Sequence, residues 1–242
     1  MKTKVHPPAV LVTGGARRIG RAIALAFADS GWDVALHFNT SGKDAESTAQ
    51  EIRGKGRQCV SFQACLDEPG EAGCLVERAG KFFPGLQAMV HSASLFRPSG
   101  LEEKDLFFLD EHMGIHVRAA WMLDAAFVRG VGKGAIVHFL DTKITTNKTE
   151  YAAYLLSKKA LAELVKMSAV SFAPAIRVNA VAPGFILPPE GKGAGYLRSR
   201  AADVPLQRKG KLLNITDTVK FLVDNDYITG QVIFVDGGEH LM

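Results

Sequence analysis

The chain has 242 residues, of which 47% are hydrophobic and 22% charged. This length and balance predict a single globular domain, residues 1–242, whose core is large enough to be stable without metals or disulfides. The formal charge of +4, from 29 basic and 25 acidic residues, is too small for a nucleic-acid-binding surface. We therefore expect no nucleic-acid partner.

The spacing of the cysteines and the length of the apolar runs exclude further classes of protein. Cys59, Cys65 and Cys74 have neither the even number of a disulfide framework nor the spacing of a zinc site. The longest tidy apolar run covers residues 22–28, far short of the ~20 residues of a membrane span. The first eight residues lack the apolar stretch of a secretion signal. These features predict a cytoplasmic protein that binds no metal and no membrane.

Short apolar runs alternate with amphipathic helical stretches along the chain. In chain order the pattern predicts strands at 9–13, 33–38, 58–63, 87–91, 134–140, 176–181 and 231–235. Between them it predicts helices at 18–30, 43–53, 71–82, 103–129, 150–172 and 215–223. Strands that are separated by helices pair in parallel. The fold class is therefore α/β, a doubly wound, Rossmann-like parallel sheet of seven strands.

One long stretch, residues 184–211, has no regular pattern. It contains Pro188-Pro189, Gly191, Gly193, Gly195 and six basic residues. A loop of this length follows the sixth strand and is usually functional or disordered. We interpret it as a substrate lid over the sheet edge, with a flexible insertion as the alternative.

A glycine-rich turn joins the first strand to the first helix. It reads Thr13-Gly14-Gly15-Ala16-Arg17-Arg18-Ile19-Gly20. Glycines let the backbone approach a pyrophosphate, and the helix N-terminus adds N–H groups and partial positive charge. This position in the first strand–helix unit favours dinucleotide binding over a plain strand end.

The end of the second strand indicates which dinucleotide is bound. An NAD site needs a carboxylate there for the ribose 2′-hydroxyl, but the segment His37–Gly42 has none before Asp44. A 2′-phosphate would meet polar donors there and Arg17 or Arg18 from the first turn. NADPH is therefore favoured over NADH, although Ser41 could also simply cap the next helix.

The predicted helix 150–172 carries a candidate catalytic pair. Tyr154 and Lys158 are four residues apart and so share one helix face. Tyr151 is excluded because Leu155 stands four residues after it. We expect Lys158 and an oxidised nicotinamide to lower the pKa of Tyr154 toward neutrality. Tyr154 would then donate a proton to a substrate that receives hydride; the alternative is a surface Tyr/Lys pair.

In their order along the chain these features resemble the short-chain dehydrogenases/reductases. The motifs are the glycine turn, Tyr154/Lys158, Arg177-Val178-Asn179 with Pro183-Gly184, and the terminal segment from Ile228-Thr229-Gly230 to Asp236-Gly237-Gly238. The resemblance covers nearly the whole chain. It implies hydride transfer with NAD(P) and assembly into homotetramers or homodimers through the long fourth and fifth helices.

Four details resemble the pteridine reductase branch, which includes the dihydromonapterin reductases. Arg18 is the sixth residue of the glycine turn, and Asp141 replaces the family's serine 13 residues before Tyr154. Ser94 and Phe96 match the residues that hold a pterin ring against the nicotinamide. The chain also ends soon after the last glycine pair, as it does in that branch.

The resemblance implies a full set of site residues. The catalytic residues would be Asp141, Tyr154 and Lys158, and the substrate would contact Arg18, Ser94, Phe96, Asp141 and Tyr154. NADPH would contact Gly14, Arg18, Ile19, Gly20, Asn39, Thr40, Ser41, Leu66, Ser92, Ala93, Tyr154, Lys158, Pro183, Gly184 and Ile186.

The chain departs from the family pattern at several positions. The Asn-Asn-Ala-Gly stretch after the fourth strand is His91-Ser92-Ala93-Ser94 here, and the relay asparagine of the fourth helix is His116. We interpret His116 as a proton relay or an interface residue. Cys65 stands where an aspartate often flanks adenine, unless Asp67 takes that place, and Thr40 stands where some relatives have an arginine.

The predicted function is NADPH-dependent reduction of pterins or dihydropterins, with dihydrofolate as a further substrate. Hydride addition to a C=N bond needs a proton on the ring nitrogen, which an aspartate beside Tyr154 can help to supply. One alternative is a carbonyl reductase acting on a ketone, aldehyde or acyl thioester. Asp141 argues against it, because a carbonyl oxyanion needs a hydroxyl donor. The other alternative is a catalytically idle NADP-sensing protein.

Overall fold

The computed structural model describes residues 6–68, 70–102, 104–188, 195 and 201–242. Its strands are β1 (Ala9–Thr13), β2 (Asp33–Phe38), β3 (Cys59–Gln63), β4 (Leu86–His91), β5 (Gly134–Phe139), β6 (Ile176–Pro183) and β7 (Val232–Val235). Its helices are α1 (Arg18–Asp29), α2 (Gly42–Gly54), α3 (Glu71–Phe82), α4 (Phe107–Met113), α5 (Ala119–Gly130), α6 (Ala152–Phe172) and α8 (Leu212–Asp224). None of the helices in these described ranges has the length and apolar character needed to cross a bilayer.

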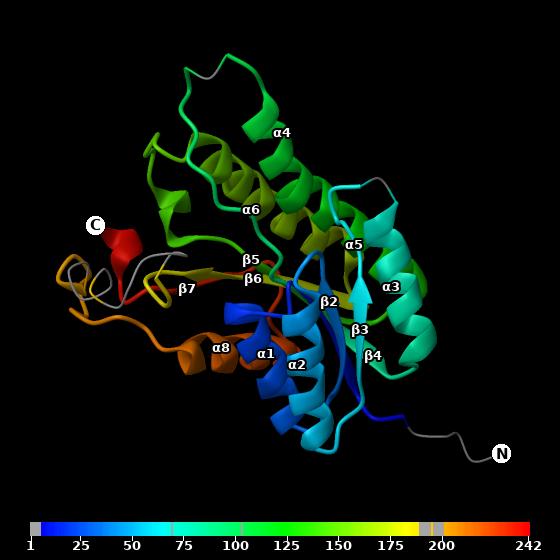
Figure 1. Cartoon of the computed structure of the whole chain (residues 1–242). Coiled ribbons are helices and arrows are strands. Elements are labelled where there is room, and N and C mark those ends of the chain that lie inside the picture. Colours follow the sequence, from blue (N-terminus) through cyan, green and yellow to red (C-terminus); the bar gives the residue numbers. More distant parts are fainter. Residues whose placement is uncertain (1–5, 69, 103, 189–194, 196–200) are drawn as a thin grey trace.

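The seven strands form one parallel sheet in the order β3-β2-β1-β4-β5-β6-β7. Helices α1, α2 and α8 cover one face, and α3, α5 and α6 cover the other (Figure 1). Both faces are therefore buried, which explains why the strands are continuous apolar runs. The predicted doubly wound α/β fold is confirmed.

The sheet order fixes where a ligand can bind. The chain winds outward from β1 to β3, then returns to place β4 beside β1 on the other side. Loops that leave β1 and β4 therefore run in opposite directions and open a crevice at the carboxyl ends of the strands. The loops after β1, β4, β5 and β6 meet at this edge.

The long helix predicted over 103–129 differs from the structure in two ways. The helix begins at Phe107, where Asp105 Oδ1 accepts the Phe107 amide; Glu103 lies outside the described residues. A π-helical turn, Gly114–Arg118, separates α4 from α5. The wider turn leaves the Ile115 carbonyl oxygen for the buried His91 ring, 3.3 Å away. A contact so distant in the sequence gives no periodic signal.

Candidate active site

The glycine turn packs tightly against the loop that follows β4. Gly14 has a positive φ of 64°, and a Cβ at this position would lie 2.9 Å from the Ala93 Cα. The Ser92 hydroxyl donates to the Thr13 carbonyl oxygen at 2.7 Å, and the Ala93 amide donates to the Thr13 hydroxyl at 3.1 Å. A Cβ on Gly20 would collide with the Gly14 carbonyl. Only glycine therefore fits at positions 14 and 20.

His37 holds the glycine turn from the neighbouring strand. The Gly14 amide donates to His37 Nδ1 at 3.1 Å, so Nε2 carries the proton and donates to the Ala64 carbonyl at 3.1 Å. Burial lowers the pKa of His37 to about 4. The ring is therefore neutral, and no positive charge from it is present under the turn. Sequence reasoning treated His37 only as part of the second strand and missed this role.

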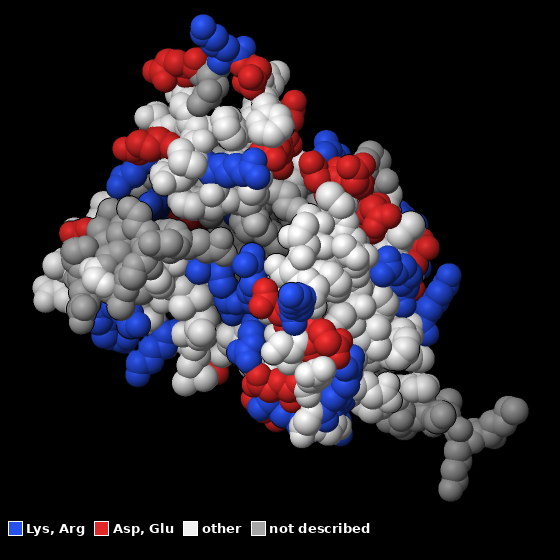
Figure 2. All heavy atoms as spheres, viewed as in Figure 1, with Lys and Arg blue, Asp and Glu red and all other residues white. Residues whose placement is uncertain are grey.

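The residues at this end of the sheet fit a dinucleotide phosphate. The first turn of α1 contains no acidic residue, and its N-cap residue, Arg17, makes no side-chain capping bond. At the end of β2, Asn39 and Thr40 are exposed, and the hydroxyl of the α2 N-cap residue Ser41 makes no capping bond. Lys and Arg side chains gather near the N-terminal ends of α1 and α2 (Figure 2). Amide, hydroxyl and cationic groups therefore surround the predicted phosphate positions.

Arg18 begins α1 with a left-handed backbone, φ 53°. Its guanidinium donates to the Pro188 carbonyl oxygen at 2.6 Å. Arg18 therefore links the glycine turn to the segment after β6, within the loop predicted to be the lid. Residues 189–194 and 196–200 of that loop lie outside the described part of the chain.

Tyr154 and Asp141 are directly bonded. The Tyr154 hydroxyl donates to Asp141 Oδ2 at 2.9 Å, and the Lys143 amide donates to Asp141 Oδ1 at 2.8 Å. Lys158 Nζ donates to the Phe139 carbonyl oxygen at 2.8 Å and lies 5.7 Å from the centre of the Tyr154 ring. The structure thus brings the three predicted catalytic residues together, between the C-terminal end of β5 and the N-terminal end of α6.

Burial controls the charges of this group. Desolvation raises the pKa of Tyr154 well above 10, and the Asp141 carboxylate raises it further. Desolvation lowers the pKa of Lys158 to about 7, although Asp141 opposes that shift. The expected lowering of the Tyr154 pKa is therefore not seen in this structure. The reason is that burial disfavours the charged phenolate and that the charged group bonded to the phenol, Asp141, is negative.

Phe96 lies beside the Tyr154 ring, and Ser94 lies beside His116. The Phe96 ring is 47% exposed, stacks on Tyr151 at 4.3 Å between ring centres, and meets the edge of Tyr154 at 4.8 Å. The Ser94 hydroxyl contacts His116 Nε2 at 2.9 Å. Tyr151, which was excluded as a catalytic residue, therefore packs against the Phe96 ring that is predicted to hold a pterin.

The other predicted cofactor residues differ in how far their side chains are buried. Ile19 is half-buried, whereas the Leu66 and Ile186 side chains are buried in the core. Pro183 ends β6, and Gly184 follows where a Cβ would lie 2.7 Å from Asp236. Their contacts with NADPH stay predictions.

Two of the departures from the family pattern have a clear position. His116 is fully buried, so the interpretation as an interface residue is wrong. Arg118 forms an ion pair with Asp67 at 2.6 Å, which ties Asp67 to the π-helical turn. Cys65 is a half-buried free thiol.

A buried carboxylate behind Asp141 was also missed. Thr142 donates to Asp236, which accepts further bonds from the Gly238 amide and from the His240 amide and ring. These hydrogen bonds lower the pKa of Asp236 against the opposing effect of its burial. The C-terminal segment therefore anchors the residue next to Asp141. The sequence does contain a signal for this carboxylate, the family motif Asp236-Gly237-Gly238, but the motif does not indicate which residues Asp236 binds.

Comparisons with known proteins agree with this geometry. The family model described as enoyl-(acyl carrier protein) reductase matches residues 14–240. The dihydromonapterin reductase of Citrobacter koseri is 32% identical over 98% of this chain and 99% of its own length. The chain belongs to the short-chain dehydrogenase/reductase family.

Other members of the family are similar to nearly the same extent. The 3-oxoacyl-[acyl-carrier-protein] reductase FabG of Staphylococcus aureus is 30% identical over 96% of this chain and 97% of its own. The solved structure of FolM alternative dihydrofolate reductase 1 from Brucella suis, in complex with NADP, has a TM-score of 0.92 and 35% identity. That match covers 98% of this chain and 96% of the Brucella chain.

Proposed function

We propose that this protein is an NADPH-dependent reductase of dihydropterins, with dihydrofolate as a further substrate. The observation that carries the proposal is the bond between Tyr154 and Asp141 at the mouth of a dinucleotide crevice. The relatives named dihydromonapterin reductase and the NADP-bound FolM structure support the same substrate class and cofactor.

The chain offers a complete cradle for the cofactor. The glycine turn and the first turn of α1 would hold the pyrophosphate with backbone amides, and Asn39, Thr40 and Ser41 offer polar groups to the 2′-phosphate. When bound, NADPH supplies the hydride.

Tyr154 holds the proton that the reduction needs. Burial and the Asp141 carboxylate raise the pKa of Tyr154, so the phenol carries its proton throughout the physiological range. This proton would pass to the ring nitrogen of a C=N bond as the hydride arrives. Asp141 orients the hydroxyl through the 2.9 Å bond. Asp141 is half-buried and reaches water, so it can return a proton from solvent to Tyr154 after each turnover.

Asp141 also separates this function from carbonyl reduction. A ketone or acyl thioester develops negative charge on oxygen, and a second anion beside Tyr154 would repel it. A pterin instead presents amino and ring N–H groups, for which a carboxylate is a strong acceptor. The similarity to FabG is therefore outweighed by the chemistry of this residue.

The experiment that tests the proposal follows NADPH oxidation with 7,8-dihydropterin, dihydrofolate, a simple ketone and an acetoacetyl thioester in parallel. We expect turnover of the two pterin compounds and little of the carbonyl compounds. Turnover of the carbonyl compounds without pterin reduction would overturn the proposal. NADPH binding with no turnover of any compound would favour the NADP-sensing alternative.

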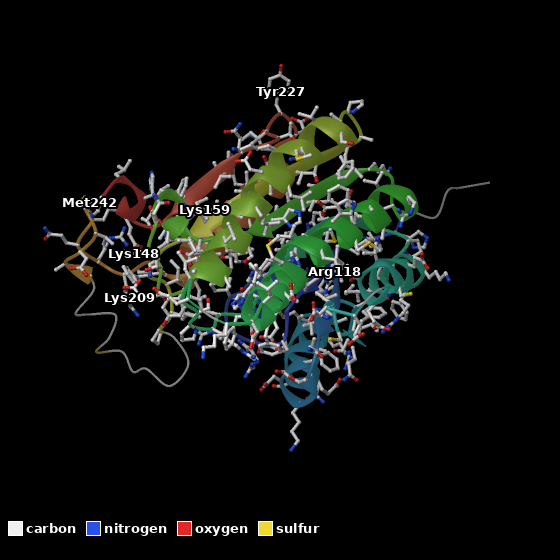
Figure 3. All side chains as sticks on the ribbon, turned by 90° about the horizontal axis from the view of Figure 1, so that it is seen from above. Arg118, Lys148, Lys159, Lys209, Tyr227 and Met242 are labelled. Carbon is white, nitrogen blue, oxygen red and sulfur yellow. The ribbon has the colours of Figure 1, made fainter. Side chains whose placement is uncertain are left out.

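We further propose that the protein assembles into a homotetramer or homodimer through α5 and α6. These helices lie side by side across one face of the molecule (Figure 3). They expose large apolar side chains, among them Trp121 (58%), Met167 (63%) and Val170 (83%). Exposed apolar patches of this kind mark interaction surfaces. Trp121→Glu should reduce the mass measured by light scattering; a monomeric wild type would contradict the assembly.

The remaining proposals concern the loop and the compartment. We infer that residues 184–211 act as the substrate lid of a single catalytic domain, supported by the bond from Arg18 to Pro188. We also infer a cytoplasmic location, supported by three free cysteines, which suit a reducing compartment.

A further inference from the structure

Two buried histidines lie behind the segment that carries Phe96. His112 lies near the C-terminal end of α4, and His116 lies four residues later, in the π-helical turn. Both side chains are fully buried, and their ring centres are 5.8 Å apart. Neither was assigned a role by the site described above.

Each imidazole accepts a backbone amide from that segment. The Leu95 amide donates to His116 Nε2 at 3.3 Å, and the Arg97 amide donates to His112 Nε2 at 3.4 Å. The two bonded amides therefore flank Phe96 on both sides. An amide only donates, so Nε2 of each ring carries no proton.

The opposite ring nitrogens complete the assignment. With Nε2 bare, the proton of each neutral ring is on Nδ1. His112 Nδ1 then donates to the Phe108 carbonyl at 2.6 Å, and His116 Nδ1 donates to the Ser157 hydroxyl at 2.8 Å. Ser157 in turn donates to the Tyr154 carbonyl at 2.7 Å. Every ring nitrogen is satisfied, and each ring joins the Phe96 segment to a helix.

We propose that His112 and His116 form a clamp of two neutral imidazoles that fixes residues 94–97 and so sets the position of Phe96 against the substrate ring. The clamp rests on the proposed function, because it assigns Phe96 to a flat heterocycle. His116 is a positioning residue on this account, and not the proton relay considered from the sequence. Burial, and after it the nearby Lys158 ammonium, lower the pKa of His116 well below 6.5, which keeps the ring neutral.

The length of the side chain makes the clamp testable. Asparagine places its amide nitrogen near imidazole Nδ1 and cannot reach the Phe96 segment, whereas glutamine places a carbonyl oxygen near Nε2 and can accept its amides. His112→Asn with His116→Asn therefore opens the clamp, and His112→Gln with His116→Gln keeps its acceptors. The two double variants are matched in chemistry and differ in reach.

Two measurements distinguish the clamp from the proposed function. Amide hydrogen exchange of Leu95 and Arg97 should accelerate about tenfold in the asparagine variant, which corresponds to one hydrogen bond of ordinary strength, and much less in the glutamine variant. The KM for 7,8-dihydropterin should rise about tenfold in the asparagine variant, the same direction as Phe96→Ala, with kcat within about threefold of wild type. The pH–rate profile should keep the wild-type dependence on both its acidic and its alkaline side.

Unchanged exchange in the asparagine variant would overturn the clamp, whatever the substrate. If the rate no longer depended on pH on one side of the profile and kcat fell strongly, His116 would be a group that transfers protons. The expected exchange pattern in a protein that does not reduce dihydropterin would preserve the amide clamp and reject the proposed function.

Discussion

At the scale of single residues, the site depends on which group carries the proton. Tyr154 is hydrogen-bonded to a carboxylate, and its pKa is raised by burial and by that carboxylate. Lys158 is fully buried against the Phe139 carbonyl. The phenol is therefore protonated and held in place, and we propose that Asp141 determines which substrates it suits.

Tyr154→Phe should abolish this donor while leaving the fold and the cofactor crevice intact. We expect kcat to fall by ~10²–10⁴, the range that a positioned general acid contributes. The dissociation constant for NADPH, measured by fluorescence titration, should change little. Tyr151→Phe is the control, since it keeps the ring that stacks on Phe96. Substantial dihydropterin reduction by Tyr154→Phe would mean that the proton comes from another group.

At the scale of elements, the site is assembled from segments that are distant in the sequence. Asp141 caps the short 3₁₀ helix Thr142–Thr145 at its N-terminus. The next residue, Thr142, is hydrogen-bonded to Asp236, which follows β7. The Phe96 segment is likewise held by α4 and the π-helical turn. The positions of the catalytic groups therefore depend on the C-terminal strand as well as on α6.

Thr142→Val removes one hydroxyl at nearly constant volume and should loosen this anchor. We expect a loss of about 1–3 kcal/mol in unfolding free energy, because a buried bond to a charged acceptor is lost. kcat should also fall several-fold as Asp141 becomes less well oriented. Urea unfolding and initial-rate kinetics measure the two effects. Thr149→Val, at an exposed position in the loop after this helix, should leave both near wild type; equal effects of the two variants would reject the anchor.

At the scale of the whole molecule, the strands were predicted within one or two residues. Buried parallel strands are continuous apolar runs, and glycines mark their ends. The proximity of Tyr154, Lys158 and Asp141 was also predicted, because their spacing matches a family pattern. The histidine clamp and the Asp236 anchor were not, since both join residues that only the folded chain brings together. The upward shift of the Tyr154 pKa could not be predicted from the sequence either, because it depends on how deeply the phenol is buried.

The buried Lys158 should also make the stability of the whole protein depend on pH. Its pKa is about 7 in the folded state, below the usual 10.5, so the unfolded chain binds more protons between these values. The unfolding free energy should therefore rise with pH across that window, by up to about 1.4 kcal/mol per pH unit from this group.

Urea unfolding of wild type and Lys158→Met from pH 7 to 10 isolates this contribution, because their difference cancels the other titrating groups. The variant should lack the rise. Lys159→Met, on the adjacent and less buried position, is the control and should keep it. Parallel curves for wild type and Lys158→Met would contradict the lowered pKa.

The central claim is that Asp141 beside Tyr154 makes this a site for pterins. The most direct test is the ratio of kcat/KM for 7,8-dihydropterin to kcat/KM for an acetoacetyl thioester, compared between wild type and Asp141→Ser. We predict that wild type favours the pterin and that the substitution lowers the ratio by about a hundredfold, the effect of one well-placed polar group in a transition state. An unchanged ratio in Asp141→Ser, or a wild type that favours the thioester, would contradict it.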